Sequence, residues 1–286
     1  MDSSEGARPK AEQVPHEYYA MNSRIWVFDF ILDWFTIVAV FYVVHLVDHW
    51  AIWPLAGLII GARLHALGLL AHDATHRTAF KNRRLNDVLG EVFVFWTFFM
   101  VLDDGYRPWH FEHHRKLGNP SDPELSYRSL HPYNEPVSWK RIWLIFALDM
   151  LGLGIIGLFR FMKAVFPYKR PIRFLGPILL WAAFAAITIY TDNLWILLLW
   201  TYSLLTGFWA VFRIRTWTEH VEATPMGKET SHRFLANPIA CFLFFPHNTY
   251  CHYEHHVWPQ VPYYNLPMTR FLHKHRPIRP MGDLFQ

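Results

Sequence analysis

Four long apolar runs constrain the fold of this 286-residue chain more than any other feature. A helix rises about 1.5 Å per residue, so each run is long enough to cross, or nearly cross, a hydrocarbon core of about 30 Å. The short segments "DHWAIWP" and "TDN" separate the first two and the last two runs, so each pair is expected to form a hairpin. The sequence therefore predicts an all-α membrane protein with four transmembrane helices, at residues 25–47, 52–71, 174–190 and 194–212.

Two further apolar runs are expected to lie in the membrane without crossing it. Residues 88–101 would rise only about 21 Å as a helix, so they are predicted to dip into one leaflet and return. Residues 142–166 are long enough to span, but they carry Asp149, Arg160 and Lys163, which favours a helix lying in the interface.

The distribution of charge predicts the orientation. Neither short turn contains Lys or Arg, whereas the other side carries many, beginning with Arg77, Lys81, Arg83 and Arg84, so that side is expected to be cytoplasmic. The net charge of +4 therefore indicates a membrane surface, and no nucleic-acid partner is expected. Because the amino-terminal residues lack a secretory signal, both termini are expected to be cytoplasmic. The predicted organisation is a tail at 1–24, a membrane domain at 25–270 whose cytoplasmic helical cap is 72–173 and 213–270, and a tail at 271–286.

Three histidine clusters carry the chemistry: "HDATH" at 72–76, "HFEHH" at 110–114 and "HYEHH" at 252–256. On a helix, residues three and four apart lie on one face, so each triple is expected to converge on one point, with His72 and His76 as a further pair. The alternative is a set of solvated surface histidines. The clustered residues are His72, His76, His110, His113, His114, His252, His255 and His256.

Neutral imidazole binds iron, zinc, copper or nickel, and eight imidazoles are more than one ion can use, so two metal ions are predicted. The chain has only 2 cysteines, which excludes a cysteine-based cluster, and a zinc hydrolase would need only three protein ligands. His220, in "RIRTWTEHVEA" just beyond the last span, is a ninth candidate, although a lone histidine can also be structural.

Polar residues beside these histidines are candidates for orienting them. They are Asp73, Glu112, Glu219 and Glu254, with Asn248 as a candidate to hold a metal-bound water. Within the spans, Arg63 falls at a depth comparable to Asp33, so an ion pair is expected. The alternative places Arg63 or His65 near a polar end of a substrate.

The three clusters, the arginine-rich approach to "EH" at 219–220 and "PHNTYCHYEHHVWPQVPYYNLP" resemble the integral-membrane desaturase and hydroxylase superfamily, in particular its bacterial fatty acid desaturase branch. The last segment and "HHRKLGNPSDPE" also look like the carotenoid ketolases of that superfamily. The resemblance covers about residues 25–270.

This resemblance implies four membrane helices beneath a cytoplasmic cap, two iron ions (Fe²⁺/Fe³⁺), O₂ as cosubstrate and attack on an unactivated C–H bond. It also implies a bacterial inner membrane and nine ligands, the eight clustered histidines and His220. No haem or dinucleotide motif accompanies them, so a separate ferredoxin, rubredoxin or cytochrome b5-type donor is expected.

The predicted activity is O₂-dependent desaturation of a membrane lipid acyl chain, with the substrate entering from the bilayer. Hydroxylation and carotenoid ketolation remain open, because they differ from desaturation only in how the substrate is placed. A membrane metal transporter is the alternative from another class, but its ligands would be expected near the bilayer midplane.

Overall fold

The computed structural model describes residues 14–117, 119–124, 138–220, 231–272 and 278–280, so most of the two predicted tails lies outside the described residues. The prediction of an all-α fold is confirmed, apart from one parallel pairing of β1 (Phe234–Leu235) with β2 (Arg279–Pro280). The α-helices are α1 (Ser23–Val47), α2 (Trp53–Thr75), α3 (Arg83–Val92), α4 (Arg107–Lys116), α6 (Trp139–Met150), α7 (Ile155–Ala164), α8 (Leu175–Tyr190), α9 (Leu194–Ser203), α10 (Trp209–His220), α11 (Pro238–Leu243), α12 (His252–Val257) and α13 (Leu266–Thr269).

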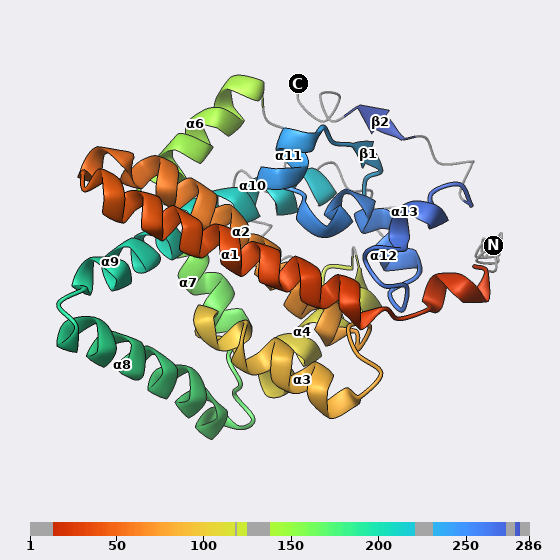
Figure 1. The fold of residues 1–286 in the computed structure, drawn as a ribbon. Coiled ribbons are helices and arrows are strands. Elements are labelled where there is room, and N and C mark those ends of the chain that lie inside the picture. The colour runs from red at the N-terminus through yellow and green to blue at the C-terminus, as the bar shows by residue number, and fades with distance from the viewer. Residues whose placement is uncertain (1–13, 118, 125–137, 221–230, 273–277, 281–286) are drawn as a thin grey trace.

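Four helical segments are long and apolar enough to cross a membrane: Ser23–Val47, Trp50–Thr75, Pro171–Tyr190 and Leu194–His220. The first two run side by side as one hairpin, and α8 and α9 form the second (Figure 1). The second and fourth segments extend beyond their predicted ends at 71 and 212, because α2 continues to Thr75 and α9 continues through a π-helical turn into α10. His72 and His220 therefore lie on the ends of long helices and not on separate elements of the cap.

Glycines allow these two long helices to touch. A Cβ added at Gly61 of α2 would lie 2.2 Å from the backbone nitrogen of Phe208, and one added at Gly207 would lie 2.0 Å from the carbonyl oxygen of Gly57. Backbones that approach this closely leave no room for a side chain. This contact fixes α2 against the π-helical turn Leu204–Phe208, and so sets the relative positions of the helix ends that carry His72 and His220.

The two remaining apolar runs form bent helix pairs. The segments Arg83–Phe98 and Leu102–Lys116 meet at 82°. This bend agrees with the prediction that the run at 88–101 does not cross the membrane. That it dips into one leaflet remains a prediction. Residues 142–166, predicted as a helix lying in the interface, are broken into α6 and α7, which meet at 80°, while their place in the interface remains a prediction. The cause is local, since Gly152 adopts φ +82°, a left-handed conformation that ends α6.

Candidate metal centre

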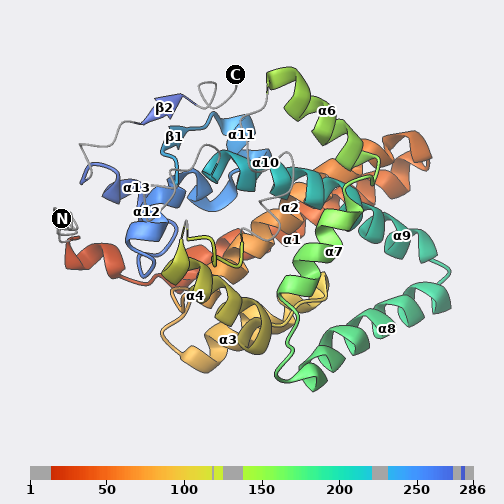
Figure 2. The same cartoon turned by 180° about the vertical axis from the view of Figure 1, so that it is seen from behind.

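The nine predicted ligands, which come from four separate helices, lie together at one end of the helical hairpins. They divide into two groups, within each of which one ligand atom per residue lies within 4.8 Å of all the others. One group is His72, His76, His110, His114 and His255, and the other is His113, His220, His252 and His256. Figures 1 and 2 both show α4 and α12, which carry the two triples, next to each other.

The expectation that each triple converges on one point is wrong. His110 and His114 belong to one group and His113 to the other, while His252 and His256 are separated from His255 in the same way. On a helix, the side chains of residues i and i+4 differ by about 40° in direction, whereas those of residues i+3 and i+4 differ by about 100°. The i and i+4 imidazoles therefore point to one centre and the i+3 imidazole to the other, so each triple bridges both groups.

The spacing of the ring nitrogens fits metal coordination. Two nitrogens that bind one ion at about 2.1 Å and at right angles are about 3.0 Å apart. In the first group the Nε2 atom of His110 lies 2.9 Å from those of His76 and His114, and in the second group the Nε2 atom of His252 lies 2.9 Å from those of His220 and His256. Both donor sets are suited to a transition metal, because they consist of imidazoles alone.

Contacts to the backbone hold α4 in place beside α2. The buried guanidinium of Arg107, the first residue of α4, donates to the carbonyl oxygens of Thr75 at 3.0 Å and Ala74 at 3.1 Å, at the end of α2. The same guanidinium lies 2.6 Å from the Asp87 carboxylate on α3. These bonds satisfy carbonyls at a helix end and position His110 opposite His76.

The environment keeps the imidazoles neutral. Burial lowers the pKa values of His110, His255 and His256 well below the ordinary value for histidine, and repulsion from the neighbouring imidazoles adds a smaller effect in the same direction. Burial has the same effect on the pKa of His252, together with His220 and Arg215. A neutral imidazole presents the lone pair that a metal requires, so the site is arranged to bind metal and to resist protonation.

Of the four carboxylates predicted to orient ligands, Glu219 contacts one, at 3.3 Å from Nδ1 of His252. The others make different contacts among the described residues. Asp73 accepts from Thr78 at 2.6 Å, and Glu254 lies 2.7 Å from Arg233. Glu112 lies on the outer face of α4, 2.6 Å from Lys116. Asn248 accepts from the Tyr250 hydroxyl and donates to the Tyr263 carbonyl.

Asp122 is an orienting residue that the sequence reasoning missed. Both of its carboxylate oxygens lie 3.0 Å from Nδ1 of His113, and the two side chains are fully buried. A carboxylate at this nitrogen fixes the tautomer in which Nε2 is free to bind metal. Glu124 follows two residues later, 3.5 Å from that Nε2. The sequence feature that contains both carboxylates is the segment "NPSDPE" after the second cluster, which also contributes to the resemblance to ketolases.

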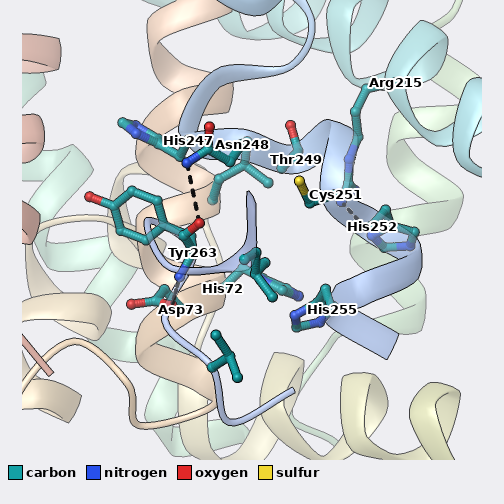
Figure 3. Close-up of a pocket in the computed structure, with 13 residues that line it drawn as sticks. His72, Asp73, Arg215, His247, Asn248, Thr249, Cys251, His252, His255 and Tyr263 are labelled. Carbon is teal, nitrogen blue, oxygen red and sulfur yellow. Dashed lines mark hydrogen bonds between the residues drawn. The ribbon is translucent and has the colours of Figure 1, made fainter. Parts of the chain in front are cut away.

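A small cavity with both polar and apolar lining residues lies beside the histidines. Its volume is about 30 Å³, room for at least one water, and Figure 3 shows His252 and His255 on one side of it with His247, Asn248 and Tyr263 on the other. His247 and Asn248 both have positive φ, +52° and +57°. Left-handed conformations at consecutive residues other than glycine are strained, and such strain is concentrated at functional sites.

The expected ion pair between Arg63 and Asp33 is present at 3.0 Å, and both side chains are buried. His247 extends it, because its Nε2 lies 2.8 Å from Asp33 and its Nδ1 lies 3.5 Å from Asp29. Burial lowers the pKa of His247, but the hydrogen bonds to the two aspartates outweigh it, so the net pKa is raised. The network joins the first hairpin to the segment that leads into α12.

Two largely apolar cavities lie next to one another, and the smaller of them reaches the proposed ligand His72. The smaller, of about 50 Å³, is lined by His72, His65 and Arg215 among aromatic side chains. The larger, of about 660 Å³, is apolar except for Lys163 and Tyr168. Four residues line both cavities: Phe98, Met100, Phe161 and Phe208. An apolar molecule in the larger cavity would therefore need to pass only these four side chains to approach His72.

Comparisons with known proteins agree with this arrangement. The chain is 44% identical over 80 residues to a dihydrorhizobitoxine desaturase of Bradyrhizobium elkanii, and 30% identical over 114 residues to an sn-1 acyl-lipid omega-3 desaturase (ferredoxin) of Nostoc sp.. These matches cover 27% and 40% of this chain, but only 22% and 31% of the two relatives' own lengths. A beta-carotene ketolase of Paracoccus sp. is 24% identical over 212 residues, which are 71% of this chain and 73% of the ketolase.

The match to a family sequence model covers more of the chain than any of these three matches to single relatives. The sequence model of the family described as "Fatty acid desaturase" matches residues 48–284, which include every histidine of the two groups. With four apolar helices and nine gathered histidines, the chain belongs to the fatty acid desaturase family.

Proposed function

We propose that this protein is an O₂-dependent non-haem diiron oxidoreductase that desaturates an acyl chain of a membrane lipid. The observation that carries the proposal is the pair of imidazole groups at the ends of membrane-length helices, next to apolar cavities. His72, His76, His110, His114 and His255 would hold one iron, and His113, His220, His252 and His256 the other.

The histidine side chains fit this use. The buried Nε2 atom of His72 has no hydrogen-bond partner among the described residues, and that of His113 has only the Glu124 carboxylate at 3.5 Å; an unpaired polar atom is costly to bury. A metal ion would satisfy both. When bound, two irons supply, with O₂ and two electrons, an oxidant strong enough to remove hydrogen from an alkyl chain, which no side chain can do.

The chain's own residues provide the placement that this chemistry needs. Asp122 holds the tautomer of His113. The Glu219 carboxylate lies 3.3 Å from Nδ1 of His252, which the Arg215 guanidinium also approaches at 3.5 Å. The largely aromatic lining of the small cavity would disfavour water beside His72, while the cavity of Figure 3 offers room for a water next to His252 and His255. Desaturation consumes O₂, two electrons and two protons and releases two waters, so a dry substrate side and a wet side are both required.

The proposed substrate is a lipid that enters from the bilayer. The large cavity of about 660 Å³ is within the size range of ligand pockets and has almost no polar lining. Lys163, at its edge, could pair with an anionic lipid head group. The metal centre is proposed to face the cytoplasm of a bacterial cell, because Lys and Arg are concentrated on its side of the spans.

A separate one-electron donor is part of the proposal. The Nostoc relative carries ferredoxin in its name, and a ferredoxin, rubredoxin or cytochrome b5-type protein would suit the basic face around the metal centre. The same basic residues could instead contact anionic lipid. Salt added to an assay with a soluble donor should slow electron transfer if the donor binds there.

Carotenoid ketolation is the second candidate, because the Paracoccus ketolase is matched over most of its length. A metal transporter is disfavoured, since both histidine groups lie at helix ends and not along a path through the spans.

Expression in a host followed by mass spectrometry of the lipid extract separates these functions. Loss of two hydrogens indicates desaturation, gain of one oxygen indicates hydroxylation, and replacement of two hydrogens by oxygen indicates ketolation. The change should be absent with His113→Ala. An unchanged lipid extract from protein that holds iron and receives electrons would contradict all three.

A further inference from the structure

One face of α2 forms a wall of the small cavity beside His72. Residues His65, Gly68, Leu69 and His72 are spaced by three, four and seven positions, and all four line this cavity. That spacing puts them on a single face of a helix. His65 lies seven residues before His72, about 10 Å further along the helix and deeper in the membrane.

His65 is a buried imidazole without a partner. It is 2% exposed, and neither Nδ1 nor Nε2 has a hydrogen-bond partner among the described residues. Leaving such a group unpaired costs about 1–3 kcal/mol. Its ring packs against the edge of the Phe212 ring, with the centroids 6.2 Å apart, and it is not part of either metal group.

Gly68 provides a second, independent indication that the small cavity holds a ligand. A Cβ added at this position would meet no atom within 4 Å, whereas one added at Gly61, two turns earlier on α2, would lie 2.2 Å from backbone. Glycine inside a helix costs about 1 kcal/mol relative to alanine. Since packing against the protein does not require a glycine here, its effect is to keep the cavity open next to His65.

The charge of the cavity limits what it could bind. Arg215 also lines it, but the Arg215 guanidinium already lies 2.6 Å from the Glu219 carboxylate. The other polar lining residues are His72, which belongs to the first metal group, Tyr106 with its hydroxyl, and His65, whose imidazole offers one donor and one acceptor when neutral. The rest of the lining is largely aromatic, including Phe95, Phe98 and Phe212.

We propose that His65 binds a neutral oxygen-bearing group of the substrate, a hydroxyl, carbonyl or ether, and that Gly68 makes room for the chain beside it. The substrate would then be an alkyl lipid with an oxygen function about 10 Å along α2 from its reacting C–H bond. This assignment rests on the proposed function only in taking the His72 end of the cavity as the place of reaction.

Binding to metal-free protein in nanodiscs tests the assignment without iron chemistry. The probes are octadecane, which carries no oxygen, and a series of octadecanol position isomers. The wild-type protein should bind one isomer about tenfold more tightly than octadecane, the effect of one buried hydrogen bond. His65→Phe should remove this preference and His65→Gln should retain part of it. Equal binding of all probes by the wild type, or an unchanged preference in His65→Phe, would overturn the proposal.

Gly68→Leu tests the space beside His65. This variant should bind the preferred isomer at least about tenfold more weakly, while its thermal midpoint stays level or rises because leucine favours the helix. Unchanged binding would show that the cavity does not hold the probe. The His65 variants and Gly68→Leu should all load iron like the wild type. Failure of the diiron proposal would therefore appear in the iron content, and failure of the His65 proposal in the binding preference.

Discussion

The Nε2 atom of His220, the last residue of α10, lies 2.9 Å from the Nε2 atom of His252, the first residue of α12. His220 is the only one of the nine proposed ligands that stands outside a histidine cluster in the sequence. Its ring also lies 5.6 Å, between centroids, from that of His256. An isolated histidine in the sequence is thus part of a compact group in the fold.

We predict that His220→Ala loses most of the metal from the second group and keeps the first. Three of four imidazoles would remain in the second group, too few for tight binding in competition with a chelator. Metal analysis after dialysis against a mild chelator checks this. His45→Ala is the matched control, since His45 is exposed near the far end of α1. Full metal retention by His220→Ala would remove this residue from the ligand set.

We predict that Asp122→Asn weakens metal binding about 10- to 100-fold, because the amide no longer favours the required tautomer of His113. The readout is the rate and extent of metal loss to a chelator at fixed pH. Glu112→Gln is the control: its carboxylate pairs with Lys116 on the outer face of α4, and metal loss should stay at the wild-type level. Equal effects of the two substitutions would contradict the role given to Asp122.

The positions of the clustered histidines were predictable because they depend on local periodicity. His72 lies in the last turn of α2 and His76 directly follows its end, so their i, i+4 spacing located the pair, although hydropathy ended the predicted span at residue 71. The division of each triple between two groups was also contained in the helical geometry, since His113 and His114 differ by about 100° in direction.

Contacts made by loops and helix breaks were harder to predict. Asp122 reaches His113 from a segment without periodicity, so no pattern announced the contact. Glu254 has a buried arginine as its partner, 21 residues away, which spacing alone cannot reveal. The break between α6 and α7 did have a signal, "LGLG" at 151–154, but apolarity across 142–166 outweighed it. Long-range pairing therefore accounts for most of the differences.

The stability of the metal-free protein should fall as pH decreases. Burial lowers the pKa values of His110, His252, His255 and His256 below the value of about 6.5 that an unfolded histidine has. Below that pH the unfolded chain binds more protons than the folded chain, so stability is fully present above about pH 6.5 and is lost below it. The free energy of unfolding should fall by up to about 1.4 kcal/mol per pH unit for each of these imidazoles.

Thermal midpoints of the metal-free protein in detergent, measured between about pH 8 and about pH 5, check this expectation. Saturating metal should move the loss to lower pH, because metal competes with protons for the same nitrogens. A midpoint that stays constant across this window, or rises as pH falls, would contradict the burial of neutral imidazoles.

Arg63→Met should destabilise the fold by about 3 kcal/mol, the lower end of the range for breaking a buried pair, because His247 still contacts Asp33. Arg173→Met is the control, since Arg173 is a half-exposed residue whose ion pairs should contribute less than about 1 kcal/mol. Thermal or denaturant unfolding in detergent provides the measurement. Normal stability together with changed lipid products would instead place Arg63 at the substrate.

Iron content, measured on active protein, tests the central claim most directly. Protein that converts lipid with O₂ and an electron donor should contain two irons per polypeptide, and the content should fall with activity in His113→Ala. The Mössbauer spectrum of the oxidised protein should account for two ferric ions per polypeptide. Full activity with one iron or less per polypeptide would contradict a centre in which the two histidine groups each hold a metal ion.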